Sequence, residues 1–297
     1  MRWLALSAAG GTMLACNCAL VSGLSQITAR DDGGSDTDGS ASDASTADTD
    51  AGGDARDSGT SRAGSALQVK TACATSSSPM ISSSFSFSNA SFTVSFWFRP
   101  DMPLMFSQEI HPIVWNGGRS TADPGWLIGI QFTSLVFCVA DAGTFVCASA
   151  PGSLGVIGHQ IHIVGVSAIA GGSRSLELWA LDATTAESVH AMVAKAANLA
   201  NSWTSTAVFT VGGVVANNGC TANVQGTIDD LRLWSTALAP TQFDANYKQT
   251  IPCNDPNLVG DFTFDEGMGT VAGNCTLKTQ QLAITGSSTW IVPSPFP

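Results

Sequence analysis

The chain has 297 residues and a formal net charge of −11, with 12 Lys and Arg residues against 23 Asp and Glu residues. This acidic balance argues against a nucleic-acid partner, because phosphate binding requires a basic surface. Composition divides the chain into a mostly apolar leader (1–29), an Asp-, Ser- and Gly-rich linker (30–66) and a domain (67–297) with nearly all aromatic and β-branched residues.

The leader has the pattern of an export signal, since Arg2 is followed by the apolar run WLALSAAGGTMLA. Two processing routes stay open. The tetrapeptide MLAC resembles a bacterial lipobox, in which Cys16 becomes the lipid-bearing first residue, whereas cleavage after Ala29 would release a soluble protein. A membrane span over residues 3–24 is a third interpretation, but Gly and Asn interrupt this run and it is barely long enough. We favour a cell-surface or outer-membrane lipoprotein whose lipid is its sole membrane contact.

The composition of the linker predicts a disordered tether. Residues 31–66 contain nine Asp, two Arg and no aromatic side chain, so this segment cannot bury enough apolar area to offset its ordering entropy. Its like charges keep it extended and soluble.

Alternation of apolar and polar residues dominates the domain. In SFTVSFWFR, Phe92, Val94, Phe96 and Phe98 share one face, which predicts a half-buried strand. Similar runs follow at 125–131, 134–140, 144–150, 160–168, 175–181, 207–213, 227–234 and 258–264. Many short strands separated by turn residues indicate an antiparallel β-sandwich or jelly roll. Residues 186–200 stay ambiguous, because their Ala content favours a helix while ESVHAMV alternates.

The cysteines agree with export. Beyond Cys16 and Cys18 six remain, and an even number suggests disulfides. If Ala142-Gly143 forms a two-residue hairpin loop, Cys138 and Cys147 lie opposite each other at a Cα separation of about 4.5 Å, which a disulfide can span. Cys253 and Cys275 flank LVGDFTF and are expected to close a local loop, which leaves Cys73 with Cys220. No pair has the C-x-x-C spacing of zinc or redox sites.

One helix is predicted near 240–248. Pro240 is a favourable first helical residue, and Phe243 with Tyr247 forms an apolar i,i+4 pair. The residue before it, Ala239, has no side-chain acceptor and should leave a helix N–H without a side-chain partner.

These segments together resemble the LamG-like jelly-roll domains of the concanavalin A-like lectin/glucanase superfamily. The resemblance rests on the order SFTVSFWFRP, GWLIGIQ, HQIHIVGVSA, SLELWALD and GTIDDLRLWSTALAPTQFDANY, and it spans roughly residues 67–297. It departs from the family at Ile161, where Trp is common, and at Ala239, where Ser commonly caps the helix. The resemblance implies an all-β concanavalin A-like sandwich and a lectin or adhesion role.

The adjacent acids Asp229 and Asp230 are the most chemistry-like feature of the chain. Strict alternation places Asp229 on the face of Leu231, and Asp230 on the face of Ile228 and Arg232, so the two carboxylates should diverge. A charge pair between Asp230 and Arg232 is then the simplest role for Asp230. One calcium ligand is the alternative for this pair, although no loop is spaced to supply the further oxygens.

No catalytic residue is predicted. The glucanase branch uses two Glu in an E-x-D-x-x-E pattern, and the four Glu of this chain are never that close. We therefore expect an exported, surface-displayed, non-catalytic binding module for carbohydrate or another extracellular ligand, with Trp115, Trp126 and Trp203 as weak candidates for stacking on sugar rings or for filling the core. A structural envelope or adhesion protein and a hydrolase of the glucanase kind are the alternatives.

Overall fold

The structure is a computed structural model, and all residues it describes belong to the unit Asp57–Pro297. The described residues are 64–69, 81–83, 91–102, 109–117, 124–141, 144–151, 156–196, 209–212, 224–247, 249–276, 281–284 and 288–297. The predicted leader, with Cys16, and all of the linker up to residue 63 lie outside these ranges. Within them, no helix is both long and hydrophobic enough to span a bilayer.

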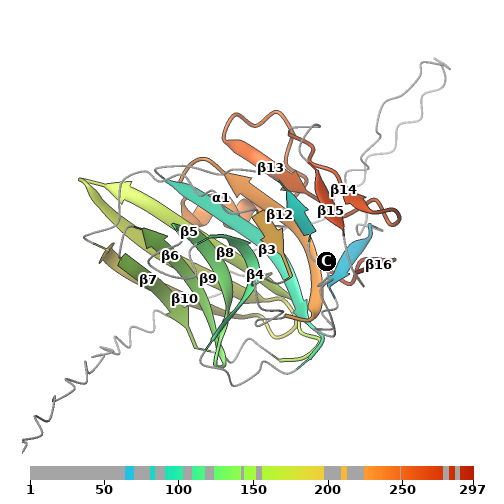
Figure 1. Cartoon of the computed structure of the whole chain (residues 1–297), viewed down its shortest axis with the longest axis horizontal. Coiled ribbons are helices and arrows are strands. Elements are labelled where there is room, and N and C mark those ends of the chain that lie inside the picture. The colour runs from blue at the N-terminus through green and yellow to red at the C-terminus, as the bar shows by residue number, and fades with distance from the viewer. Residues whose placement is uncertain are drawn as a thin grey trace, which may run out of the picture. The chain divides into compact units, whose positions relative to one another are not determined.

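Two antiparallel sheets form a sandwich, which confirms the predicted fold class (Figure 1). Sheet A has the strand order β10-β9-β8-β3-β12-β1-β16, and β13 also pairs with β12. Its strands are β1 (Ala66–Val69), β3 (Phe92–Pro100), β8 (Ile161–Ala170), β9 (Ser173–Asp182), β10 (Glu187–Ala196), β12 (Gly226–Trp234), β13 (Leu258–Phe262) and β16 (Thr289–Ile291). Within the ambiguous segment 186–200, residues 187–196 therefore form a strand at the edge of sheet A.

Sheet B has the order β14-β15-β2-β11-β4-β5-β6-β7. Its strands are β2 (Ile81–Ser83), β4 (Ile110–Asn116), β5 (Gly125–Gln131), β6 (Ser134–Asp141), β7 (Thr144–Ala150), β11 (Phe209–Val211), β14 (Val271–Ala272) and β15 (Leu282–Ile284). The predicted hairpin between β6 and β7 has the expected register, with Asp141 opposite Thr144.

The main core lies between the sheets and follows the predicted alternation. Phe92, Val94, Phe96 and Phe98 all belong to it. The sheets approach closely at Gly165 of β8, where an added Cβ would lie 2.8 Å from Ile128 Cδ1 of the facing sheet. A larger side chain at this position would therefore push the two layers apart.

Strand β3 is buried on both faces, so the expectation of a half-buried strand was wrong. Two further apolar clusters cover the outer face of sheet A. One joins Val164 and Trp234 to the helix α1 (Pro240–Asn246) through Phe243. The other joins Trp97 of β3 to Phe296 near the C-terminus. The helix and the C-terminal segment thus exclude water from a face that alternation alone predicts to be solvated.

The helix α1 begins at Pro240, as predicted, and its N-cap residue Ala239 makes no side-chain capping hydrogen bond. The Gln242 side chain compensates in part, because its Oε1 accepts a hydrogen bond from the Ala239 backbone N–H at 2.8 Å. This contact satisfies the N–H of the N-cap residue, which is a different donor from the helix N–H that a serine at position 239 would bind.

Both ends of the domain meet at one place. The Ser294 N–H donates a hydrogen bond to the Gly64 carbonyl oxygen at 2.6 Å, and the Ser65 hydroxyl donates to the Phe264 carbonyl oxygen at 2.7 Å. Strand β1 pairs with both β12 and β16, beside the C-terminus (Figure 1). The first and last described segments are therefore parts of the same sheet.

Candidate functional site

A β-bulge interrupts β12 at the acidic pair. Asp229 lies opposite Trp97 of β3, but the next paired residue, Arg232, lies opposite Ser95, so β12 has an extra residue here. Asp230 takes the left-handed conformation, with a φ of 48°, which Asp tolerates better than most residues. The bulge resets the alternation of the strand.

The prediction that strict alternation separates Ile228 from Leu231 was therefore wrong. Ile228 and Leu231 both belong to the core between the sheets. The physical reason is the extra residue at Asp229–Asp230, which shifts the side-chain direction by one position. The Asp229 carboxylate accepts a hydrogen bond from Ser294, whereas Asp230 lies 3.3 Å from Arg232; the charge of Asp230 contributes to raising the pKa of Asp229.

Asp229 is a buried, hydrogen-bonded acid with 7% of its surface exposed. Its Oδ1 accepts from the Asp230 N–H at 2.9 Å, and its Oδ2 accepts from the Ser294 hydroxyl at 2.7 Å. Burial is the main cause that raises the pKa of Asp229 well above its usual value, and the charges of Asp230 and Asp265 add to it. These contacts connect the bulge to the C-terminal segment.

We expect Asp229→Asn to raise the free energy of unfolding near neutral pH. The Asp229 pKa is higher in the folded protein than its usual value of 3.8, so the folded state binds the proton more tightly. That contribution is complete below the unfolded pKa and is lost as pH rises through the folded pKa. Each unit of pKa elevation corresponds to about 1.4 kcal/mol. Urea denaturation from about pH 4 to about pH 8 should show a flatter pH dependence in the variant.

Asp244→Asn is the matched control. Asp244 is an exposed residue of α1, and its partial removal from water raises its pKa in the same direction. This control should change the pH dependence of unfolding much less. If Asp229→Asn instead destabilised the protein at pH 8, the negative charge of Asp229 would be needed in the folded state, as a cation ligand requires.

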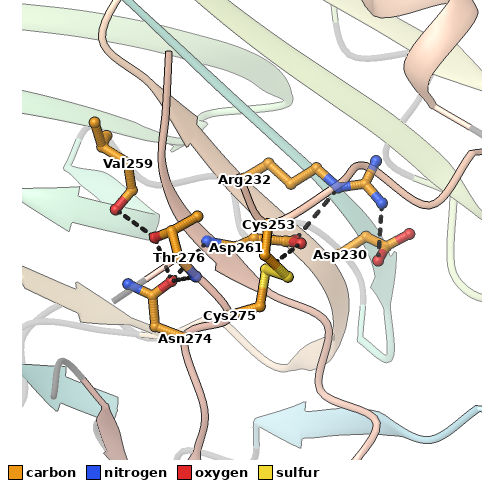
Figure 2. The surroundings of a disulfide bond; sticks show 8 residues. All are labelled: Asp230, Arg232, Cys253, Val259, Asp261, Asn274, Cys275 and Thr276. Atoms are coloured by element: carbon orange, nitrogen blue, oxygen red, sulfur yellow. Dashed lines mark hydrogen bonds and ion pairs between the residues drawn. A yellow bond between two sulfur atoms is a disulfide. The ribbon is translucent and has the colours of Figure 1, made fainter. Parts of the chain in front are cut away.

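Arg232 is the centre of a buried ion-pair network, with only 2% of its side chain exposed. It lies 3.3 Å from an Asp230 oxygen and 3.4 Å from an Asp261 oxygen (Figure 2). The predicted charge pair between Asp230 and Arg232 is therefore confirmed. Two further guanidinium N–H groups donate to the backbone oxygens of Asn246 and Gln249 at 2.9 and 3.0 Å. Arg232 thus fixes the end of α1 to sheet A.

The Cys253–Cys275 disulfide adjoins this network. Asp261 is 1% exposed, and its Oδ2 lies 3.2 Å from Cys275 Sγ (Figure 2). The Asp261 N–H donates to Asn274 Oδ1 at 3.1 Å, and the Cys275 N–H donates to the Asp261 carbonyl oxygen at 3.0 Å. Asp261 is a site residue that the sequence analysis did not single out. The pairing of Cys253 with Cys275 across its strand was the available signal.

Of the other two predicted disulfides, the structure describes one. Cys138 and Cys147 lie opposite each other on β6 and β7. They form a disulfide with a Cα separation of 4.0 Å. Cys73 and Cys220 lie outside the described residues.

The candidate tryptophans occupy different environments. Trp126 is completely buried and packs against Phe92 and Phe209, so of the two roles left open by the sequence it fills the core and does not stack on a sugar. Its strand places it on the inner face of sheet B. Trp203 lies outside the described residues. Trp115 is half-buried on the outer face of sheet B, beside a small apolar cluster that includes Leu127.

His162 is a structural residue. Its ring lies 5.1 Å from the ring of Trp97 and 5.6 Å from that of Tyr247. Burial, and secondarily the charge of Arg232, lowers the pKa of His162 to about 3. The imidazole is therefore neutral at physiological pH and acts as part of the aromatic packing over sheet A.

Comparisons with known proteins agree with this fold. No curated protein sequence matched the chain. Among solved structures, a protein of Bacteroides ovatus ATCC 8483 described as a candidate carbohydrate-binding protein has 14% identity and a TM-score of 0.50. The match covers 77% of this chain and 60% of that protein, so the chain spans less than two thirds of its length.

Two further structures are less similar. The heptameric SAP-like pentraxin of Limulus polyphemus has 12% identity and a TM-score of 0.46, over 76% of this chain and 97% of the pentraxin. The binding domain of botulinum neurotoxin DC, solved in complex with SialylT, has 15% identity and a TM-score of 0.39, over 59% and 38% of the two chains. Residues 74–243 match the family profile of Laminin_G_3. The chain therefore belongs to the concanavalin A-like lectin/glucanases superfamily.

Proposed function

We propose that the domain is a non-catalytic binding module for carbohydrate, displayed outside the cell. Membership of the superfamily supports a lectin role but does not assign a ligand, because function lies in the site and not in the fold. The observation that carries the proposal is the position of Trp115. It is a half-buried indole on the outer face of sheet B.

The surroundings of Trp115 suit a sugar ring. It lies opposite Leu127 of β5 and Thr210 of β11, and it packs beside a cluster of the buried residues Leu127, Val136 and Cys138. The indole Nε1 is buried and has no hydrogen-bond partner among the described residues. The exposed part of the half-buried indole offers a surface on which the apolar face of a sugar ring can pack.

Trp115→Ala is expected to abolish glycan binding in a glycan-array and calorimetric comparison. Loss of the stacking surface should raise the dissociation constant at least tenfold, which corresponds to about 1.4 kcal/mol. Trp179→Ala is the matched control, because Trp179 is also half-buried but lies on β9 in sheet A. Binding should survive in the control.

The same screen tests the alternatives. A folded wild-type chain that binds no glycan would favour the structural envelope role. Hydrolysis of β-glucans by the wild-type chain would favour an enzyme of the glucanase kind. Equal binding by wild type and Trp115→Ala would remove Trp115 from the site, although the domain would remain a lectin.

Surface display rests on the leader. We propose that Cys16 carries the lipid and that the Asp-rich linker holds the domain clear of the membrane; release after Ala29 is the alternative. Mass spectrometry of the mature N-terminus distinguishes them, because a lipidated N-terminal Cys and an unmodified Arg30 differ in mass and in detergent partitioning.

Calcium binding by Asp229 and Asp230 stays a prediction. Asp265 adds a third nearby carboxyl group, since its charge raises the pKa of Asp229. The Arg232 guanidinium beside Asp230 opposes a cation there. Thermal unfolding with excess Ca²⁺ and with a chelator tests the site: a calcium-dependent rise in Tm that Asp229→Asn removes would assign it, and identical curves would refute it.

A further inference from the structure

The buried carboxylate of Asp261 faces a sulfur atom that cannot donate a hydrogen bond in the disulfide. Asp261 Oδ2 and Cys275 Sγ are 3.2 Å apart, and Asp261 is 1% exposed. A disulfide sulfur has no proton, whereas a thiol is a weak donor. This contact becomes favourable for the ionised carboxylate when Cys275 is a thiol or when a cation lies between the two atoms.

Three potential ligand atoms converge at this point. The sulfur atoms of Cys253 and Cys275 and a carboxylate oxygen of Asp261 all lie within 4.8 Å of one another. Tetrahedral zinc with Zn–S near 2.3 Å and Zn–O near 2.0 Å brings its ligand atoms to about 3.5–3.8 Å of each other. Both cysteines are half-buried, so water can take the fourth position.

Neighbouring residues already fix the position of Asp261 and of the segment that carries Cys275. Arg232 Nε lies 3.4 Å from the other Asp261 oxygen. Asn274 Oδ1 accepts hydrogen bonds from the backbone N–H groups of Asp261 and Thr276 at 3.1 and 3.0 Å. Such outer contacts orient the ligands of metal sites and contribute to their affinity.

The charges favour a divalent ion. With both thiolates formed, Cys253, Cys275 and Asp261 carry three negative charges against the single positive charge of Arg232. Arg232 also pairs with Asp230. A dication is required to balance this group, and two thiolates favour zinc over calcium or magnesium.

We propose that reduction of the Cys253–Cys275 disulfide creates a zinc site formed by Cys253, Asp261 and Cys275. A dithiol reductant supplies two electrons and two protons, breaks the S–S bond and is itself oxidised to a disulfide. Two thiols result, and zinc binding releases their two protons to solvent. The metal then replaces the covalent link between the segment after α1 and the segment after β14, and Asp261 adds a ligand from β13.

Cobalt substitution tests this site in the full chain. The protein is reduced with a phosphine, which does not compete as a thiol ligand, and titrated with Co²⁺. We expect one equivalent to give a thiolate-to-cobalt charge-transfer band that excess Zn²⁺ removes. Cys253→Ser with Cys275→Ser should eliminate the band, and Asp261→Asn should weaken Co²⁺ affinity at least tenfold.

The matched control is Cys138→Ser with Cys147→Ser, which removes the other described disulfide. This variant should keep the band, because within the described residues the acid-and-cysteine group lies only around Cys253 and Cys275. A band that survives without Cys253 and Cys275, or an affinity that Asp261→Asn leaves unchanged, overturns the proposal.

A second measurement covers the case in which reduction loosens the fold. Zn²⁺ should raise the Tm of the reduced wild-type chain, and should not do so in the variant without Cys253 and Cys275. Recovery of native near-UV dichroism on adding Zn²⁺ to a reduced, unfolded chain supports the site. Failure of Zn²⁺ to shift the Tm or restore the spectrum overturns it.

Discussion

Arg232→Met is expected to lower the free energy of unfolding by about 3–5 kcal/mol, because removing one partner of a buried ion pair leaves an uncompensated charge. The carboxylates of Asp230 and Asp261 would both lose this partner. The backbone oxygens of Asn246 and Gln249 would lose a donor, so the end of α1 would also be released. Urea denaturation followed by tryptophan fluorescence measures the change.

Arg99→Met is the matched control for this prediction. Arg99 pairs with Asp101 at 3.4 Å, but 24% and 21% of the two side chains are exposed. A pair that is more accessible to water than that of Arg232 contributes less, about 0–1 kcal/mol when it lies at the surface. Similar losses of unfolding free energy in the two variants would contradict the central role assigned to Arg232. They would indicate that water solvates the carboxylates of Asp230 and Asp261 once Arg232 is removed.

Trp126→Ala should be the second severe substitution. Trp126 is fully buried, with ring centroids 5.6 Å from Phe92 and 6.0 Å from Phe209. Truncation would open a cavity between the sheets and cost about 3–5 kcal/mol. Differential scanning calorimetry would record this as a lower Tm, and glycan affinity of the folded fraction should be unchanged.

Trp115→Ala provides the opposite result for comparison. Trp115 is half-buried at the outer face, so its truncation should cost clearly less stability than that of Trp126 while it removes glycan binding. If Trp115→Ala unfolds the domain as strongly as Trp126→Ala, Trp115 is a packing residue and the binding proposal loses its main support.

The position of Trp126 in the core, in contrast to Trp115 on the outer face, could have been predicted from the sequence. In GWLIGIQ, Trp126 lies on the same face of the strand as Ile128 and Ile130. The face with large apolar residues at every second position is expected to point into the core. The structure places both isoleucines in the core with Trp126. Proximity to Gly and polar residues was therefore a weaker signal than strand parity.

The arrangement of the acids could not have been predicted in the same way. Alternation assumes one residue against one residue, and the bulge at Asp229–Asp230 breaks this rule through a single left-handed residue. Two adjacent carboxylates in an apolar strand hint at such an irregularity, but the register with β3 decides it. Register depends on long-range pairing, which periodicity does not encode.

Burial on the outer face of sheet A was also beyond local patterns. The strands there are covered by α1 and by the segment near Phe296, both of which are distant in sequence from β3. Asp261 is likewise enclosed by residues distant from it in sequence, Arg232 and the Cys253–Cys275 disulfide. Periodicity located β3 correctly, but the elements that cover its outer face follow only from the tertiary structure.

The hydrogen bond from Ser294 to Gly64 has a practical consequence for engineering. A unit whose entry and exit points touch can be spliced into an exposed turn of a host protein without stretching that host. New termini could equally be opened at a hairpin tip, with a short linker joining Gly64 to Ser294. The domain is thus suited to use as a transplantable cassette.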